Sequence, residues 1–197
     1  EVACENKGKI VGDYEVGIFD PETGIEKPQG EDGEIWVRGY LVMLGYYKNP
    51  EATAAAITPE GWFRTGDLGQ IDPDGYLMIT GRAKEMFIVG GSNAYPAEIE
   101  RFLEGHENIY QAVVCGVPDA RMGEVGFTFV MPPPGATLDP EDVIAHCRGA
   151  IADYKVPRYV EVVDDFPRTS TNKIQRYLLQ QDALARFEER EENHGDD

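Results

Sequence analysis

The sequence predicts an α+β fold in two successive parts, a strand-rich part up to about residue 82 and a mixed α/β part from about residue 85. Short apolar runs separated by glycine- and proline-containing turns fill the first part. In the second part, runs with helical spacing that follow a proline alternate with apolar strands. With 197 residues, 42% of them hydrophobic, the chain is long enough for one or two modest domains.

The first part is typified by the strand predicted over 33–39, GEIWVRG, in which Ile35 and Val37 share one face. The alternate positions are expected on the opposite face, and these are Glu34, Trp36 and Arg38. The other elements expected in this part are a short helix over 49–57 and a strand over 75–80.

The second part begins with a strand that runs into the glycine pair Gly90-Gly91. Pro96 marks the first turn of a helix, and a second helix is expected to be capped by Asp139 with Pro140 at its first position. The remaining elements are strands over 110–117, 126–131 and 159–163, and a final helix that starts near residue 174.

The charge balance excludes several classes of function. The 36 acidic residues against 18 basic ones give a formal net charge of −18, which repels nucleic acids and anionic membranes, so no nucleic-acid partner is expected. No run approaches the roughly 18 apolar residues that span a bilayer, and the first residues lack the features of a signal peptide. The sequence therefore predicts no membrane span and a cytoplasmic location.

Cysteines and histidines offer no metal site. Cys4, Cys115 and Cys147 are odd in number and lack paired spacing, so neither a disulfide framework nor a zinc site is expected, and Cys115 and Cys147 are expected to be buried thiols. The histidines, at 106, 146 and 194, are expected to be isolated, with His146 on the polar side of its helix. We expect no metal-ligating residues in this chain.

Three segments contain residues that suit chemistry, although each residue alone also has a structural explanation. Asp67 in WFRTGDLG could cap a turn, or its carboxylate could accept hydrogen bonds from the two hydroxyls of a ribose. In GRAKEMFIVGG, Arg82 and Lys84 could be surface cations, and Gly91 could belong to a plain turn or allow close approach of a ligand. Lys173 in PRTSTNKIQR could be solvated, or could be aimed at a phosphoryl group.

The order of the motifs is more informative than any one of them. GEIWVRGYLVMLGYYKNPEAT, WFRTGDLG, GRAKEMFIVGGSNAYPAEIE and PRTSTNKIQR follow one another with suitable spacing across nearly the whole chain. This pattern strongly resembles the adenylate-forming acyl-CoA synthetase family, which includes luciferases and the adenylation domains of peptide synthetases.

The resemblance implies a role for each candidate residue. Asp67 and Arg82 would bind the ribose of ATP, and Lys173 would contact the substrate carboxylate and the α-phosphate as the catalytic lysine. Lys84 would lie at a hinge formed by 83–84, and Gly91 in a loop of the CoA tunnel. Residues 1–82 would then be the distorted β-barrel subdomain that ends the large N-terminal domain, and 85–197 the small mobile C-terminal domain.

The resemblance also implies the substrates. A carboxylic acid, with a fatty acid favoured, would be activated with ATP and Mg²⁺ to acyl-AMP and transferred to CoA. The family's phosphate loop and its magnesium-binding glutamate would lie upstream of residue 1, so this chain without the missing N-terminal domain is expected to be inactive. Asn172 stands where the family usually has glycine.

Three other interpretations stay open: an acyl-AMP ligase that stops at the adenylate, a peptide-synthetase adenylation domain, and a non-catalytic binding module that has kept the fold. The identity of the acid and the oligomeric state, a homodimer included, also stay open.

Overall fold

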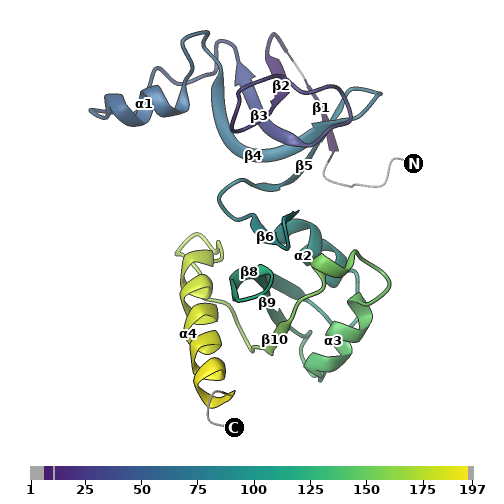
Figure 1. Ribbon diagram of the computed structural model, residues 1–197. Helices are drawn as coiled ribbons and strands as arrows, with labels where there is room; N and C mark the ends of the chain where they lie inside the picture. The colour runs from purple at the N-terminus through teal and green to yellow at the C-terminus, as the bar shows by residue number, and fades with distance from the viewer. Residues whose placement is uncertain (1–6, 11, 195–197) are drawn as a thin grey trace. The chain divides into compact units, whose positions relative to one another are not determined.

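The structure is a computed structural model that describes residues 7–10 and 12–194 (Figure 1). The chain divides into two compact units, Glu1–Lys84 (unit 1) and Glu85–Asp197 (unit 2). Each unit has its own sheet, and helices accompany both sheets, so the predicted α+β class is confirmed. Within the described part of the chain, no helix has both the length and the apolar character that a membrane span requires.

Unit 1 is built on a five-stranded antiparallel sheet with the strand order β1-β5-β4-β3-β2, so that the long β4 is the central strand. The short helix α1 follows β3, and its N-cap residue Asn49 accepts a hydrogen bond from the amide of Ala52. The elements of unit 1 are β1 (Lys7–Lys9), β2 (Glu15–Phe19), β3 (Gly33–Arg38), α1 (Pro50–Ala56), β4 (Phe63–Ile71) and β5 (Tyr76–Arg82).

Both faces of β3 are buried, which the alternation of its residues does not indicate. The strand itself is confirmed, but Glu34 and Trp36 are only 4% and 6% exposed. The ring of Trp36 stacks on that of Phe19 at a centroid distance of 4.2 Å, and its Nε1 donates to the carboxylate of Glu34. Alternation along a strand predicts two faces, but it does not reveal that an aromatic side chain from the neighbouring strand covers the second one.

Unit 2 has a mixed sheet in which β9 pairs with β8 and β6 antiparallel and with β10 parallel. The described elements of unit 2 are β6 (Phe87–Val89), β7 (Ser92–Ala94), α2 (Pro96–Glu104), β8 (Gln111–Asp119), β9 (Gly123–Met131), α3 (Pro140–Cys147), the 3-10 turn η1 (Asp153–Lys155), β10 (Tyr159–Val162) and α4 (Arg176–His194).

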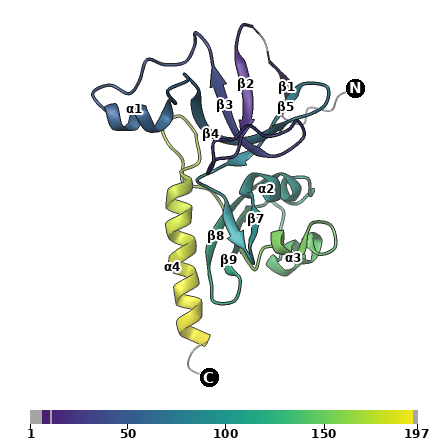
Figure 2. The same ribbon diagram turned by 45° about the horizontal axis from the view of Figure 1, so that its top comes forward.

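Helices cover both faces of this sheet. Figures 1 and 2 show α2 and α3 on one side of the β8–β9 pair and α4 on the other. Two hydrophobic clusters result, one containing Val114 and Val130 under α2 and α3, and one containing Val113 and Phe129 under α4. Burying one such large apolar side chain contributes about 1.5–3 kcal/mol, so the apolar strands and the helices stabilise each other.

The predictions made for the cysteines and for the histidines have different outcomes in the structure. Cys115 and Cys147 are buried free thiols, as predicted, and Cys4 lies outside the described residues. His106 and His146 are not isolated, because their rings meet edge to face at 4.7 Å and His146 also stacks on Phe102. The prediction overlooked this cluster because it joins the ends of two helices that are far apart in the sequence.

Candidate active site

Asp67 and Arg82 form one half of the candidate site, in unit 1. They are register partners on β4 and β5, and Nε of Arg82 lies 2.9 Å from Oδ1 of Asp67. The side chain of Asp67 is 28% exposed, so it remains open to a ligand. A carboxylate has about four lone-pair sites, and therefore one that is paired with a single arginine nitrogen can still accept hydrogen bonds from hydroxyl groups.

Asp67 lies within a strand, and the alternative that it caps a turn is wrong. The strand is irregular there, because Gly66 has φ of +73° and the register shifts on both sides of β4. The hydroxyl of Thr65 donates to the carbonyl of Ile35 at 2.7 Å and accepts from the amide of Asp67 at 3.0 Å. Glycine is required at 66 by its backbone conformation, which other residues adopt only at a cost.

Lys84 and Gly91 lie close to the start of unit 2. Lys84 is exposed in the turn between β5 and β6. Gly90 and Gly91 make the two-residue connection of the β6–β7 hairpin with φ of +57° and +84°, the signs expected for a type I′ turn. A Cβ atom at Gly91 would meet no atom within 4 Å apart from its chain neighbours, so the backbone there is open to close approach.

Lys173 is exposed and lies in a short loop of unit 2 that is closed by hydrogen bonds. Arg168 and Ile174 form an antiparallel bridge, and the amide of Thr169 donates to the carbonyl of Lys173 at 2.8 Å. The amide of Lys173 donates to the hydroxyl of Thr169 at 3.1 Å. Asn172 has φ of +64°, a conformation that asparagine tolerates better than most residues and that explains how it can stand in place of glycine.

Two arginines fix this loop to the rest of unit 2, and the sequence did not reveal either. Before the lysine, Arg168 donates to the side chain of Gln111 on β8 at 2.7 Å. After it, Arg176 donates twice to the carboxylate of Glu100 on α2, at 2.7 and 2.6 Å. The side chain of Glu100 is 7% exposed and also accepts from the amide of Val114. One signal was available: Glu100 adjoins Ile99 on the apolar face of its helix.

The electrostatics of this pair favour the charged arginine. Burial by itself lowers the pKa of Arg176, but its hydrogen bonds to Glu100 and the negative charges of Glu100 and Glu85 outweigh burial. The pKa of Arg176 is therefore raised above its ordinary value, and the arginine stays charged.

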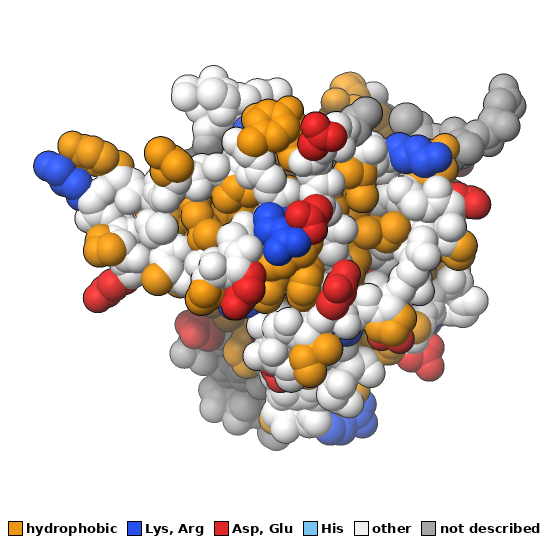
Figure 3. Space-filling view, turned by 90° about the horizontal axis from the view of Figure 1, so that it is seen from above, with side chains coloured by type: hydrophobic (Ala, Val, Ile, Leu, Met, Phe, Trp, Pro, Cys, Tyr) orange, Lys and Arg blue, Asp and Glu red, His pale blue; other side chains and the backbone are white. Residues whose placement is uncertain are grey.

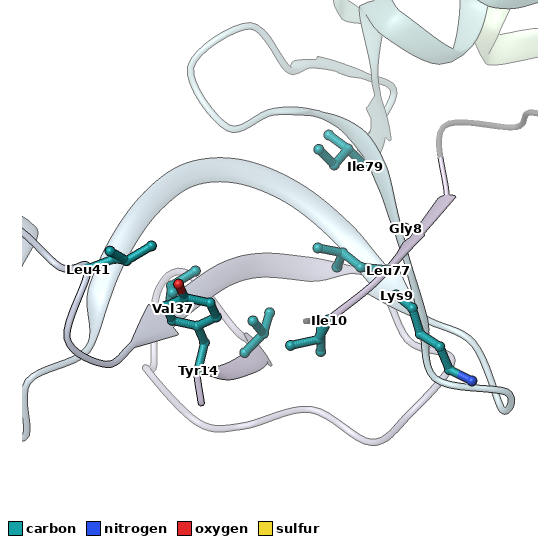
Figure 4. A pocket seen from close by; sticks show the side chains of 9 residues that line it. Gly8, Lys9, Ile10, Tyr14, Val37, Leu41, Leu77 and Ile79 are labelled. Atoms are coloured by element: carbon teal, nitrogen blue, oxygen red, sulfur yellow. The ribbon is translucent and has the colours of Figure 1, made fainter. Parts of the chain in front are cut away.

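Unit 1 also contains an apolar pocket of about 370 Å³ that none of the predicted site residues line (Figure 4). Tyr14 and Leu41 contribute to its wall, together with Leu77 and Ile79 of β5. Figure 3 shows hydrophobic side chains in several places on the visible face, next to acidic and basic ones.

Among the residues that the structure describes, no group of three or more histidine, cysteine, aspartate or glutamate side chains could hold a metal ion.

Comparison with known proteins agrees with these motifs. Residues 98–173 match the family model "AMP-binding enzyme C-terminal domain", and residues 3–47 match the model "AMP-binding enzyme". The chain belongs to the adenylate-forming, AMP-binding enzyme family. The predicted family is therefore confirmed.

Curated relatives of the chain include acyl-CoA ligases. The chain is 45% identical over 174 residues to the mitochondrial medium-chain acyl-CoA ligase ACSF2 of Danio rerio, covering 88% of this chain and 29% of that protein. The crystal structure of ATP-bound MatB from Rhodopseudomonas palustris matches with a TM-score of 0.83 and 39% identity, over 88% of this chain and 35% of that one.

A third relative is o-succinylbenzoate CoA synthetase (MenE) of Bacillus subtilis, solved in complex with the acyl-adenylate intermediate OSB-AMP. It matches with a TM-score of 0.77 and 33% identity, over 85% of this chain and 34% of that one. The chain thus spans about a third of the length of the curated relatives and solved structures that it matches.

Proposed function

We propose that this chain is the C-terminal portion of an ATP-dependent acyl-CoA synthetase that activates a carboxylic acid, with a fatty acid as the favoured substrate, as acyl-AMP and transfers it to CoA. The observation that carries the proposal is the combination of the Asp67–Arg82 pair with Lys173 on a loop fixed at both ends. The similarity to a medium-chain acyl-CoA ligase supports a fatty acid as the substrate.

Asp67 and Arg82 would bind the ribose of ATP. Oδ1 of Asp67 is held by Arg82, so the carboxylate has a fixed orientation and can accept the two adjacent ribose hydroxyls. Arg82 is 62% exposed, and it would support the sugar from the next strand. The exposed pair itself contributes little to stability, so its value lies in orientation.

Lys173 would act during adenylation. When a carboxylate attacks the α-phosphate, two anions approach each other and negative charge develops on the phosphoryl oxygens. An ammonium group that is already held near this position reduces the repulsion and stabilises the transition state. The described residues of this chain do not gather into a magnesium site, and we assign no step of the reaction to a metal held by them.

We further propose that residues 83–84 are a hinge between a large-domain subdomain, 1–82, and a mobile domain, 85–197. Rotation about Lys84 would withdraw Lys173 after adenylation and present the loop containing Gly91 for thioester formation with CoA. This chain alone would be inactive, because Asp67 and Lys173 each supply only part of a site.

The test is ATP–pyrophosphate exchange with a panel of carboxylic acids, measured on the complete protein that contains this chain and on the chain alone. Lys173→Ala should reduce exchange strongly, and should affect thioester formation from a supplied acyl-adenylate much less. Lys155→Ala, which removes a lysine paired with Glu98 in the same unit, is the matched control and should leave both steps near normal. Equal loss of both steps in Lys173→Ala would contradict the assigned role.

The second half of the reaction is tested by its product. Consumption of CoA and formation of an acyl-CoA thioester would support a ligase. Accumulation of acyl-AMP without thioester would identify an enzyme that stops at the adenylate, and no exchange with a folded complete protein would favour a non-catalytic module.

A further inference from the structure

We propose that Glu34 is a positioning residue for nucleotide recognition: its buried carboxylate holds the irregular segment of β4 that directs Asp67 toward the ribose. This proposal rests on the proposed function, because it assumes that Asp67 binds the sugar. Glu34 would not touch the nucleotide itself. It lies on β3, the strand next to the one that carries Asp67.

The register of β3 and β4 leaves backbone groups of β4 without regular partners in the sheet. Glu34 pairs with Leu68 and Trp36 pairs with Arg64, so residues 65–67 all lie opposite Ile35. A strand segment with extra residues bulges, and its backbone groups lose their regular ladder partners. Inside a sheet these groups must find other partners, because an unpaired buried N–H group is costly.

The carboxylate of Glu34 supplies a partner at the centre of the bulge. Its Oε1 accepts from the amide of Gly66 at 3.1 Å. Gly66 immediately precedes Asp67 and has φ of +73°, so this hydrogen bond fixes the backbone that sets the direction of the Asp67 side chain. The adjacent bond from Thr65 to the carbonyl of Ile35 holds the other side of the bulge.

The second oxygen of Glu34 accepts hydrogen bonds from other residues than Gly66. Oε2 accepts from Nε1 of Trp36 at 2.8 Å and from Nη2 of Arg64 at 3.0 Å. Arg64 thereby balances the charge of a carboxylate that is only 6% exposed. A carboxylate that served only to neutralise Arg64 would not need the contact with Gly66, and the two oxygens can therefore be tested separately.

The decisive measurement is selectivity for the sugar, since a purely structural role would not change it. In the complete protein, kcat/KM for adenylation is compared between ATP and 2′-deoxy-ATP. A hydroxyl bound by a carboxylate should give a preference for ATP of about tenfold or more. Asp67→Asn should reduce this preference to within a few fold. Glu34→Gln should do the same, because glutamine has a single side-chain oxygen and Trp36 and Arg64 donate to the Oε2 position. With that oxygen held there, the NH₂ group of the glutamine faces the amide of Gly66 and cannot accept from it. In the double variant Glu34→Gln/Asp67→Asn, the preference should be no lower than in Asp67→Asn.

Trp36→Phe is the matched control. It removes a donor to Oε2, keeps the aromatic ring that stacks on Phe19, and leaves the contact of Oε1 with Gly66 in place. The preference for ATP should persist in this variant even if its stability falls. Loss of the preference in Trp36→Phe would assign the effect to general packing and overturn the proposal.

The outcomes separate this inference from the proposed function. If Asp67→Asn keeps the preference for ATP, the assigned ribose role of Asp67 fails. If Asp67→Asn loses the preference but Glu34→Gln keeps it, only the role of Glu34 is overturned.

Hydrogen exchange of the Gly66 amide in this chain gives a readout that does not depend on activity: it should be slow in the wild type and in Trp36→Phe, and fast in Glu34→Gln. Should Glu34→Gln fail to fold, Glu34→Asp replaces it, since its shorter side chain keeps the charge but holds the carboxylate farther from the amide of Gly66. Sugar selectivity and protection of Gly66 should then fall together, and loss of one without the other would overturn the proposal.

Discussion

Arg176 is expected to be a major determinant of the stability of unit 2. Replacement with methionine keeps most of the length and the apolar stem of the side chain but removes both hydrogen bonds to Glu100. Glu100 would then be left as a buried carboxylate whose remaining partner is the amide of Val114. A buried charge that has lost its counter-charge is among the most destabilising changes a single substitution can make.

The exposure of the Arg176 and Glu100 side chains sets how much stability the substitution should remove. Removing one partner of a fully buried ion pair costs about 3–5 kcal/mol, whereas an exposed pair contributes roughly 0–1 kcal/mol. Glu100 is 7% exposed and Arg176 is 34% exposed, so the pair lies closer to the buried case. We expect Arg176→Met to lower the free energy of unfolding by about 3 kcal/mol, and with a urea m value of about 2 kcal/mol per M the midpoint shifts by roughly 1.5 M.

The assay can distinguish the two units. Both tryptophans, Trp36 and Trp62, lie in unit 1, so their fluorescence reports unfolding there, while most of the helix seen by circular dichroism lies in unit 2. The circular dichroism transition should shift, and the fluorescence transition should move much less. The double variant Arg176→Met/Glu100→Gln should recover much of the loss, because glutamine can still accept from Val114. A cost below about 1 kcal/mol, or additive effects in the double variant, would refute the reasoning.

Three further predictions concern other residues of unit 2. Burial raises the pKa of the Cys115 thiol to about 12 and that of Cys147 to about 11, so iodoacetamide at pH 8 should label both only on unfolding; fast labelling in the native state, detected by peptide mass spectrometry, would contradict this. Burial and the neighbouring His106 lower the pKa of His146 below its ordinary value of about 6.5, so the native state binds this proton less tightly than the unfolded state does. The free energy of unfolding should therefore fall as the pH drops below about 6.5, and His146→Gln should flatten that part of the pH profile in urea titrations. Asn172→Gly should be nearly neutral, whereas Asn172→Val should cost about 1–2 kcal/mol in thermal or urea unfolding, because a β-branched residue resists positive φ; equal stabilities of the two variants would count against the loop conformation.

Local signals in the sequence predicted local structure well. Pro50, Pro96 and Pro140 each mark the first residue of a helix, because proline has the required φ and its missing N–H group is not needed there. The last helix begins at Arg176, two residues after the expected start, since Ile174 is engaged in the bridge with Arg168. Such a contact across the loop cannot be inferred from helical spacing.

The candidate site was predictable in part. Asp67, Arg82 and Lys173 are candidates because they occur in an ordered series of motifs, and not because their local environment is distinctive. The alternation along β3 places Glu34 on the face opposite Ile35, but it does not indicate that Glu34 is buried and accepts a hydrogen bond from a residue 32 positions along the chain. Contacts of this kind depend on which strands become neighbours, and alternation within a single strand carries no information about that.

The loop of Lys173 has a consequence for the entropy of ligand binding. The β-bridge between Arg168 and Ile174 already fixes its backbone, and the side chains of Arg168 and Arg176 attach its two ends to the rest of unit 2. Ordering a free loop of this length would cost roughly 1–2 kcal/mol for each residue, which would consume much of the attraction between an ammonium group and a phosphate. If Lys173 contacts a phosphate as proposed, only the rotamers of the lysine itself remain to be ordered, at roughly 2 kcal/mol, and no further cost arises from ordering the loop backbone.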